Sequence, residues 1–573
     1  MLLLAILLAF AGVTARLTQL QLVAPQAYAE RGMAQRLHTV ELPAERGSIF
    51  DRNGNELALS VRQRTVWADP RQVEDPAAAA ASLAPVIGVA EADLRSRLSD
   101  DKARFVYLAR KIDDQRADAV SKLDLAGVGL LDESRRFRPA GDVAVSLLGD
   151  VDVDDRGLSG LELQYEDGLS GGPGELLVEQ GIDGGTIAGG EHRLRPATRG
   201  DDLVLTIDRS LQYEVEQALI AQVSATKAKG GMGVVMDPTT GDILAMASVA
   251  SSEDDQPPRP TSDNAALTAV FEPGSASKVV TMSGVLQEGV ARPDTVLSVA
   301  DNLQVGPKRF TDSESHATRP MSVEEILAES SNVGTITLAR QLGPQRVDDY
   351  LRRFGFGGAT GLEFPGESAG IVPKLDAWSS TTIGSIAIGQ GVAVNAVQML
   401  GATNTVANKG VQVTPRLVRS VIDSNGEEHP QPVAPGARVV SPETAAEMTT
   451  MLTSAVADGT GTNATVEGYQ VAGKTGTARK PSAVIRGYEP GAYTAVFTGF
   501  VPAEDPKLSA IVVLDEPHPY YGGVVAAPVF SQIAEYGLRL LRIPPPEGPP
   551  TTGPEGAPAS PTEPAAVAVT PRD

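Results

Sequence analysis

Apolar and polar positions along the chain fall into three regimes with different spacing. The first is an uncharged apolar run of 14 residues, 2–15, which continues in helical register through Leu17, Leu20 and Leu22. A membrane-spanning helix needs roughly 20 residues, and a secretory signal begins with a basic segment that is missing here. We expect residues 1–23 to form an uncleaved membrane anchor whose start codon has been placed too late. The alternative is a cleavable signal.

The second regime, residues 24–200, mixes strand and helix patterns. The stretch RGSIFDRNGNELALS at 46–60 has two apolar runs around an Asn-Gly pair, which is typical of a β-hairpin. An Ala-rich, charged stretch at 75–125 predicts helices, and GLSGGPGE at 168–175 predicts a loop. We expect these residues to form a mixed module of strands and helices.

The third regime, residues 201–542, opens with the alternating strand LVLTI and a helix for which Asp208 is the expected N-cap. The stretch at 230–248 then reads as strand, turn, strand, and helix and strand patterns alternate from there on. Residues 543–573 contain ten prolines, so they predict a disordered, extended tail. The predicted fold is therefore a multidomain α+β chain with its largest unit at 201–542.

Composition narrows the possible functions. The 573 residues are enough for two to four domains, and the net charge of −23 argues against a nucleic-acid-binding surface. The chain has no cysteine, which excludes disulfides, thiol catalysis and Cys-ligated zinc. Its five histidines are scattered without metal-binding spacing. We predict neither a metal site nor a cofactor.

A phosphate-binding loop is the first motif to test. Residues 468–475, GYQVAGKT, match G-x-x-x-x-G-K-T, but such a loop needs a helix that begins at its lysine. Three glycines and two prolines at 476–491 oppose that helix, since interior proline costs ~3 kcal/mol and glycine ~1 kcal/mol. The pattern instead predicts an antiparallel meander, and we reject an ATPase. Its three strands are expected at 466–478, 493–501 and 508–515.

A second motif, GLSGG at 168–172, matches the G-x-S-x-G nucleophile elbow of hydrolases. That elbow needs an apolar strand before the serine and a helix after it. The surrounding sequence QYEDGLSGGPGE supplies neither. Ser170 is therefore predicted to be an ordinary loop serine.

A third motif, FEPGSASKVVTMSGVL at 271–286, has the chemistry that the others lack. A Pro-Gly pair breaks the chain, and the following apolar helix has Ser275 in its first turn. Lys278 lies at i+3 and shares the face of Ser275, whereas the adjacent Ser277 points about 100° away. Ser275 is therefore the candidate nucleophile.

Two further motifs follow in a fixed order. Ser330 and Asn332 form S-x-N between two helical patterns, and Lys474 begins K-T-G on a predicted strand. Each motif alone has an ordinary explanation, namely a turn serine, a helix cap or a solvated charge. The order S-x-x-K, S-x-N, K-T-G, however, is that of penicillin-binding proteins and serine β-lactamases.

With these motifs the chain resembles a class B penicillin-binding protein over nearly its whole length, most closely the division-type, FtsI-like branch. RGSIFDRNGNELA and GLSGLELQYEDGLSGGPGE resemble the N-terminal pedestal (dimerisation-type) module, placed at 24–200. FEPGSASK, SSNVG, IAIGQGVAVNAVQM, AGKTGTA and YYGGVVAAPVF resemble the transpeptidase domain, placed at 201–542. The resemblance implies an antiparallel sheet flanked by helices, like that of serine β-lactamases. One departure is SASK, where many relatives carry a bulkier residue before the lysine.

The chemistry implied by the resemblance is acyl transfer. Ser275 would attack the carbonyl between two D-alanines of a peptidoglycan stem peptide, and a second stem's amine would then take the acyl group. Lys278 would be the base, Ser330 would relay the proton to the leaving amine, and Asn332 would bind the substrate amide. A lysine acts as a base only when neutral, so its pKa must fall from ~10.4 to near 7. The surroundings must therefore disfavour the charged amine by roughly 4–5 kcal/mol. Burial and the nearby Lys474 cation are the expected causes.

The resemblance also implies how substrate is held. The peptide would lie beside strand 474–477 as an added strand, with its terminal carboxylate near Lys474 and the hydroxyls of Thr475 and Thr477. Gly476 would permit its close approach. The backbone N–H groups of Ser275 and Thr477 would form the oxyanion hole, and β-lactams would acylate the same serine.

Location and partners follow from the same resemblance. We expect a single-pass protein of the cell membrane with its catalytic domain on the extracytoplasmic side. Its expected partners are a polytopic SEDS-type glycosyltransferase and other divisome membrane proteins, with no nucleic acid. The alternatives are an elongation-type class B synthase, a serine β-lactamase or penicillin sensor, and a non-catalytic scaffold. A β-lactamase is disfavoured because no E-x-x-L-N segment lies between Asn332 and Lys474.

The remaining candidate residues are interpreted as structural. Glu162 is expected to be a buried partner of an arginine, or else part of a partner surface. Trp378 is expected in the core. Turn or pedestal roles are expected for Arg46, Asp51, Gly54, Gly389, Gln390 and Gly391.

Overall fold

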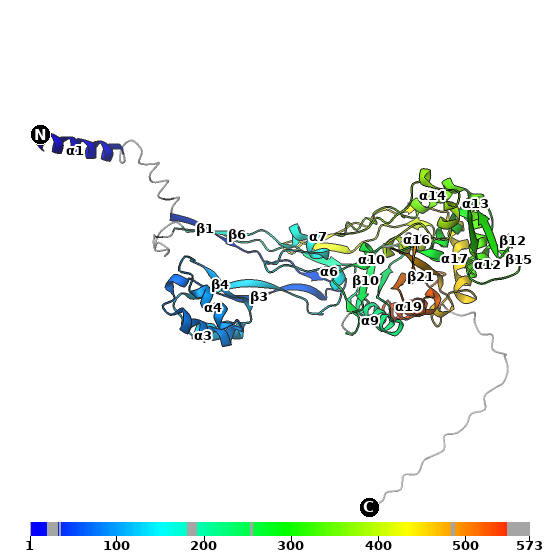
Figure 1. Cartoon of the computed structure of the whole chain (residues 1–573), viewed down its shortest axis with the longest axis horizontal. Helices are drawn as coiled ribbons and strands as arrows, with labels where there is room; N and C mark the ends of the chain where they lie inside the picture. The colour runs from blue at the N-terminus through cyan, green and yellow to red at the C-terminus, as the bar shows by residue number, and fades with distance from the viewer. Residues whose placement is uncertain are drawn as a thin grey trace, which may run out of the picture.

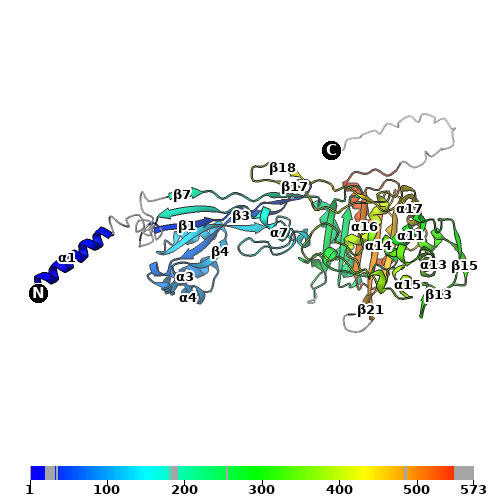
Figure 2. The ribbon, with the colours of Figure 1, turned by 90° about the horizontal axis from the view of Figure 1, so that it is seen from above.

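The computed structural model describes residues 2–19, 33, 36–179, 181, 192–252, 256–482 and 487–546. Over these residues the molecule is elongated. Helix α1 lies at one end, a β-rich module follows, and a larger domain of sheet and helices forms the other end (Figures 1 and 2). Most of the tail predicted at 543–573 lies outside the described residues, from 547 onward.

Helix α1 (Leu2–Thr18) is 17 residues long and has no buried side chain. Its leucines, together with Ile6 and Phe10, are among the most exposed apolar side chains of the chain. No helix in the described part of the chain combines the length and the apolar character that crossing a bilayer requires. The last residues of the anchor predicted at 1–23 lie outside the described ranges.

The head of the pedestal is built around the 13-residue strand β3 (Glu56–Ala68), which pairs with β4 (Val106–Ile112) and β5 (Val128–Phe137). Three helices pack on one face of this sheet around a separate apolar core. The first starts at Pro76 because the carboxylate of Asp75 accepts from the N–H groups of Ala77 and Ala78. The helices predicted at 75–125 are confirmed in part, as α3 (Pro76–Ile87), α4 (Glu91–Leu98) and α5 (Asp114–Lys122). The prediction is wrong at 106–112, which form β4 and pair with β3.

The predicted hairpin at 46–60 is confirmed as β2 (Ile49–Phe50) followed by β3. Asp51 closes its turn, since its carboxylate accepts from the N–H groups of Asn53 and Asn55 at 2.8 Å. Gly54 has a φ of +81°, a conformation that favours glycine. Both residues are structural, as expected. The rest of the pedestal is a three-stranded antiparallel sheet of β1 (Leu37–Leu42), β6 (Gly174–Glu179) and β7 (His192–Arg195).

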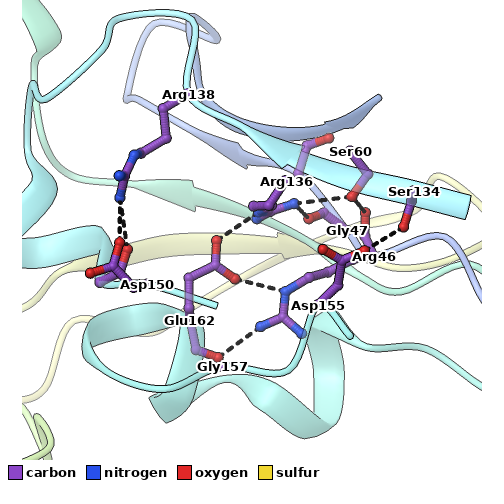
Figure 3. Close-up of polar contacts among 12 residues, drawn as sticks. Arg46, Gly47, Ser60, Ser134, Arg136, Arg138, Asp150, Asp155, Gly157 and Glu162 are labelled. Carbon is purple, nitrogen blue, oxygen red and sulfur yellow. Dashed lines mark hydrogen bonds and ion pairs between the residues drawn. The ribbon is translucent and has the colours of Figure 1, made fainter. Parts of the chain in front are cut away.

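A buried group of charges joins the hairpin to the end of the pedestal (Figure 3). Arg46 and Arg136 each donate from Nε to one carboxylate oxygen of Glu162 at 2.7 Å. The three side chains are at most 6% exposed. The expectation that Glu162 is a buried partner of an arginine is confirmed, and it has two.

The pedestal and the larger domain share a sheet. Strand β8 (Asp202–Leu205) pairs in parallel with β2 of the hairpin and antiparallel with β17 (Val418–Ile422). The sheet order β18-β17-β8-β2-β3-β4 therefore runs from one module into the other. The strand predicted at the start of 201–542 therefore also pairs with the hairpin of the pedestal.

The larger domain is centred on a six-stranded sheet with the order β11-β10-β9-β22-β21-β20. Helices α9 (Arg209–Thr226) and α19 (Ala527–Leu540) cover one face, and α11 (Lys278–Gln287) and α16 (Ala396–Ala407) cover the other. Asp208 is the N-cap of α9, as predicted. Strands β9 (Gly230–Met236) and β10 (Ile243–Ala250) confirm the strand-turn-strand pattern.

The predicted meander is confirmed as β20 (Ala472–Pro481), β21 (Tyr488–Val501) and β22 (Leu508–Asp515), all antiparallel. Lys474 and Thr475 lie inside β20, so no helix begins there and the phosphate-loop interpretation is excluded. β20 forms one edge of the sheet and pairs with β21 alone. Trp378 packs against the main core, as predicted.

The other described elements complete these sheets or connect the layers. They are η2 (Pro70–Gln72), α6 (Val145–Leu148), α7 (Gly160–Gln164), α8 (Glu166–Leu169), β11 (Arg259–Pro260), α10 (Ala265–Thr268), η3 (Gly274–Ser277), β12 (Val296–Val299), β13 (Asn302–Val305), β14 (Lys308–Thr311), β15 (Arg319–Ser322), α12 (Val323–Ala328), α13 (Asn332–Leu342), α14 (Pro344–Arg353), η4 (Leu375–Ala377), α15 (Thr382–Ile386), β16 (Val411–Gln412), β18 (Glu428–Pro430), β19 (Ala437–Arg438), α17 (Pro442–Ala457), η5 (Thr462–Ala464) and α18 (Gly522–Val525).

Candidate active site

The candidate nucleophile lies on a short 3₁₀ turn, η3, which runs directly into α11. Ser275 is partly exposed, whereas the following Ala276, Ser277 and Lys278 are buried. The hydroxyl of Ser277 donates to the carbonyl of Gly274 at 3.0 Å, so it serves the turn itself. Within the described part of the chain no hydrogen bond involves the hydroxyl of Ser275, so Ser275 is the candidate of this pair to react.

Lys278 is fully buried beneath this turn. Its Nζ lies 2.6 Å from the carbonyl oxygen of Ser330, 2.9 Å from Oδ1 of Asn332 and 3.2 Å from Oγ of Ser330. Burial lowers the pKa of Lys278 well below its usual value, and the Lys474 charge lowers it further. A neutral amine can donate to the two carbonyl oxygens and keep its lone pair for a hydroxyl proton.

Ser330 and Asn332 lie on the turn between α12 and α13. Ser330 has a φ of +63°, a left-handed conformation that costs a non-glycine residue about 1–3 kcal/mol. Ser331 is the N-cap of α13, since its hydroxyl accepts from the N–H of Gly334. The strained turn thus directs both the carbonyl and the hydroxyl of Ser330 at Lys278.

One residue that the sequence does not point to, Asp312, holds this turn in place. Its Oδ1 accepts from the N–H groups of Asn332 at 2.5 Å and Val333 at 2.9 Å, and its Oδ2 accepts from the hydroxyl of Ser331 at 2.8 Å. A carboxylate at a helix N-terminus satisfies free N–H groups and complements the helix dipole. Nε2 of His316 lies 3.0 Å from Oδ2 of the same carboxylate. No local pattern links Asp312 to a helix that starts 20 residues later.

Lys474 lies on the edge strand β20 and is 1% exposed. Burial lowers its pKa to about 7. Its Nζ lies 3.4 Å from the hydroxyl oxygens of Thr460 and Thr475, which are 2.7 Å from each other. Neither Lys278 nor Lys474 forms an ion pair with an acid in the described part of the chain, and the carboxylate of Asp312 acts on Lys278 by its charge alone. Two lysines without acidic partners and a lining of hydroxyl groups suit an anionic ligand.

Gly476 and Thr477 bring β20 against the nucleophile turn. A Cβ on Gly476 would lie 2.5 Å from the carbonyl oxygen of Pro273, and one on Gly274 would lie 3.0 Å from that of Thr477. Packing against the turn thus requires the glycine at 476, a reason that the sequence does not reveal; its predicted role in the approach of a substrate stays a prediction. The hydroxyl of Thr477 accepts from the N–H of Gly522 at 3.1 Å, a contact that the sequence does not predict.

The predicted residues therefore fall into two contacting groups. Lys278, Ser330 and Asn332 are in direct contact, and Lys474 and Thr475 form a second cluster with the hydroxyl of Thr460. The turn that carries Ser275 packs directly on the strand that carries Thr477. Ser170, at the end of α8, lies in the pedestal and takes no part in this site.

Comparisons with known proteins agree with this geometry. Residues 231–535 match the family model described as the penicillin-binding protein transpeptidase domain, and residues 41–205 match the penicillin-binding protein dimerisation domain. The chain is 34% identical to penicillin-binding protein PbpB of Mycolicibacterium smegmatis, over 89% of this chain and 85% of that protein. It is 33% identical to peptidoglycan D,D-transpeptidase FtsI of Escherichia coli, over 94% and 91%.

Solved structures show the same likeness. A peptidoglycan synthetase from Bifidobacterium adolescentis superimposes with a TM-score of 0.73 at 30% identity, over 90% of this chain and 98% of that one. Penicillin-binding protein 3 of Mycobacterium tuberculosis, complexed with aztreonam, gives 0.69 at 30% identity, over 89% and 99%.

Proposed function

The chain belongs to the class B penicillin-binding proteins, and from that membership we propose how its residues carry out transpeptidation. It is a serine-type peptidoglycan D,D-transpeptidase. The proposal assigns the nucleophile to Ser275 and the base to Lys278. The observation that carries it is the buried Lys278, whose Nζ contacts both motif residues Ser330 and Asn332.

In the first step, Lys278 takes the proton of the Ser275 hydroxyl as Oγ attacks the carbonyl carbon of the penultimate D-alanine. The backbone N–H groups of Ser275 and Thr477 stabilise the oxyanion. When the C–N bond breaks, the proton passes from Lys278 through the Ser330 hydroxyl to the leaving amine. D-Alanine departs and an ester links the donor stem to Ser275.

The anionic end of the donor peptide is held by the pocket of Lys474. The terminal carboxylate takes its place beside the ammonium group and accepts from the hydroxyls of Thr475 and Thr460. Binding of this anion favours the protonated form of Lys474, which in turn favours neutral Lys278 through repulsion of charge. Substrate binding and activation of the base are thereby coupled.

The second step reverses the proton path. The amine of an acceptor stem attacks the ester carbonyl, and its proton passes to Lys278 as the new amide forms. Ser275 regains its proton from the lysine, so the catalyst is restored. A β-lactam enters the same path. Ser275 attacks its ring carbonyl, the ring C–N bond breaks, and the nitrogen takes the proton but stays attached to the acyl group.

We further propose that the enzyme acts in septal wall synthesis at the membrane. The FtsI and PbpB names of its relatives are consistent with a division role, and the fully exposed apolar helix α1 suits insertion into lipid. In this proposal the protein is a single-pass membrane protein with its catalytic domain outside, and a SEDS-type glycosyltransferase and other divisome membrane proteins are its partners.

Intact-mass measurement after incubation with penicillin, followed by peptide mapping, tests the assignment. We expect one adduct per chain on Ser275, none in Ser275→Ala, and an unchanged adduct in Ser170→Ala, the serine of the unused G-x-S-x-G motif. Labelling of Ser275→Ala at the wild-type rate would refute the nucleophile assignment.

A further inference from the structure

Glu272, three residues before the nucleophile, is a buried carboxylate that the chemistry above does not use. It is 7% exposed. Its Oε1 accepts from the backbone N–H of Gly391 at 2.8 Å, and its Oε2 accepts from the hydroxyl of Tyr488 at 3.1 Å. The carboxylate therefore bonds to two segments that lie more than 100 residues away in the sequence.

The first partner belongs to the glycine turn at 389–391. Gly389 and Gly391 have φ values of +74° and +75°, which confirms the turn expected there. This turn also contacts the nucleophile turn directly, because the N–H of Gly274 donates to the carbonyl of Gly389 at 3.1 Å. A Cβ on Gly389 would lie 2.1 Å from the carbonyl oxygen of Gly274, so the two segments are in tight contact.

The second partner belongs to the meander. Tyr488 is the first residue of β21 and pairs with Pro481 at the end of β20. Strand β20 carries Thr477, one of the two proposed oxyanion-hole residues, and Glu272 lies in the segment that carries Ser275, the other. The hydrogen bond between Glu272 and Tyr488 therefore joins the segment that carries Ser275 to the β20/β21 pair that carries Thr477.

Burying the carboxylate of Glu272 costs free energy, and packing alone does not require a charged group at this position. Burial raises the pKa of Glu272, and it raises that of Tyr488 to about 12. The nearby cation is Lys308, whose charge favours the ionised Glu272 and whose Nζ donates to Ser385. An apolar side chain would fill the same space without this cost, so the acceptor function of the carboxylate is the feature to be explained.

We propose that Glu272 is a positioning residue, which fixes the nucleophile turn against β20 and the glycine turn so that both oxyanion-hole N–H groups meet the same oxygen atom. The inference rests on the proposed role of Ser275 as nucleophile. The two segments also pack closely against each other at Gly476 and Pro273, independently of Glu272. Loss of Glu272 should therefore misalign the hole without opening it, and cost less than the ~10²–10³-fold of losing a donor.

Acylation by penicillin, resolved into the dissociation constant Ks of the first complex and the rate constant k2 of acylation, tests this role. For Glu272→Leu we expect k2 to fall about 10- to 30-fold with Ks within about 2-fold of wild type. Tyr488→Phe removes one of the two bonds and should lower k2 about 3- to 10-fold. Because both variants break the same bridge, the double variant should be no slower than Glu272→Leu.

Two further variants separate positioning from folding. Glu272→Gln can accept from Gly391 and donate to Tyr488, so we expect it to restore k2 to within about 3-fold of wild type. Tyr469→Phe is the matched control, since its hydroxyl donates to the carbonyl of Ile543 at the end of the domain, and it should leave k2 unchanged. Rates are measured per acylation-competent site, which removes any unfolded fraction.

The inference is overturned if Tyr488→Phe acylates like wild type, if the double variant shows the product of the single effects, or if Glu272→Gln is as slow as Glu272→Leu. A failure of the nucleophile assignment has a different signature, since wild-type protein would then carry its adduct elsewhere. If Glu272→Leu does not fold, Tyr488→Phe and Glu272→Gln decide alone.

Discussion

Two buried groups of charge in the described part of the chain are arranged in opposite ways. In the pedestal, Glu162 lies between Arg46 and Arg136, so every charge faces an opposite one. In the catalytic domain, burial lowers the pKa of both Lys278 and Lys474, the charge of Lys474 lowers that of Lys278 further, and neither lysine forms an ion pair with a described acid. Paired buried charges hold segments together, whereas unpaired ones keep reactive groups in the form that chemistry needs. The comparison predicts that the two groups respond differently to mutation.

The largest effect is expected at the base. Lys278→Met keeps the volume but removes the amine, and we expect the rate of acylation by penicillin to fall roughly 10³- to 10⁴-fold, in the range of lost general-base catalysis. Stopped-flow or gel-based labelling measures this rate. The protein should remain folded, because the change replaces a costly buried amine by an apolar chain. Loss of the folded state in this variant would contradict the contrast drawn here.

The next largest effect is expected in the pedestal, where a mutation should lower stability and leave the acylation rate unchanged. Glu162→Ala leaves the buried Arg136 without its acid and leaves Arg46 with Glu166 alone, and breaking such a buried pair typically costs about 3–5 kcal/mol of unfolding free energy. Urea denaturation followed by circular dichroism measures the loss. The folded fraction should still be acylated at the wild-type rate, because Lys278 and its partners are untouched.

The matched control for that variant is an exposed pair on α19. Glu535 and Arg539 lie 3.3 Å apart with side chains 55% and 71% exposed, and such surface pairs contribute about 0–1 kcal/mol. Glu535→Ala should therefore change stability little. An equal loss in both variants would remove the distinction between buried and exposed pairs.

A smaller effect is expected in the pH dependence of stability. The pKa of Lys474 is about 7 in the folded protein against 10.5 for a free lysine. Between these values the unfolded chain binds more protons than the folded one, so the stability rises with pH over this window. Lys474→Met should remove part of that slope and raise the unfolding free energy at pH 7.5 by about 1–2 kcal/mol. Denaturation midpoints at pH 7, 8 and 9 measure both quantities, and a steeper slope in the variant would contradict the prediction.

The elements that the sequence predicts are those whose signals are local. Asp208 caps α9, the Asn-Gly pair turns the hairpin, and glycines and prolines after Lys474 exclude a helix. The three motifs that contain the candidate site residues are local as well, because each needs only its own helix start, turn or strand. Only the resemblance predicts that they converge, and the contacts of Lys278 with Ser330 and Asn332 agree with it.

The contacts that the sequence does not predict depend on distant packing. Asp312 and Thr460 contact motif residues across 20 and 15 positions without belonging to any motif. The need for glycine at 476 comes from the carbonyl of Pro273, some two hundred residues earlier in the chain. Such partners are set by how the turn, the helix and the edge strand are placed in space, which periodicity and capping rules do not determine.

The smallest effect concerns Asp312, an acid whose charge acts on the buried Lys278. Its carboxylate favours the ammonium form of Lys278 and so raises the pKa of that lysine, against burial and Lys474. Acylation needs the neutral amine, so its rate rises with pH through the pKa of Lys278. In Asp312→Asn that rise should move to lower pH, while the high-pH rate falls only a few-fold, since Oδ1 of the asparagine can still accept from Asn332 and Val333.

Acylation rates between pH 5.5 and 9 test the shift, with Asp301→Asn as control. Asp301 accepts from the backbone N–H of His316 and does not contact the S-x-N turn, so its variant should keep the wild-type profile. His316 must be considered, because its hydrogen bonds to the carbonyl of Ala317 and to Asp312 raise its pKa and its charge offsets that of Asp312 at low pH. The shift in Asp312→Asn should therefore be clearest on the alkaline side of the His316 titration. A shift to higher pH would mean that Asp312 acts on the base only by holding α13, and the catalytic lysines would then be independent of any acid in the domain.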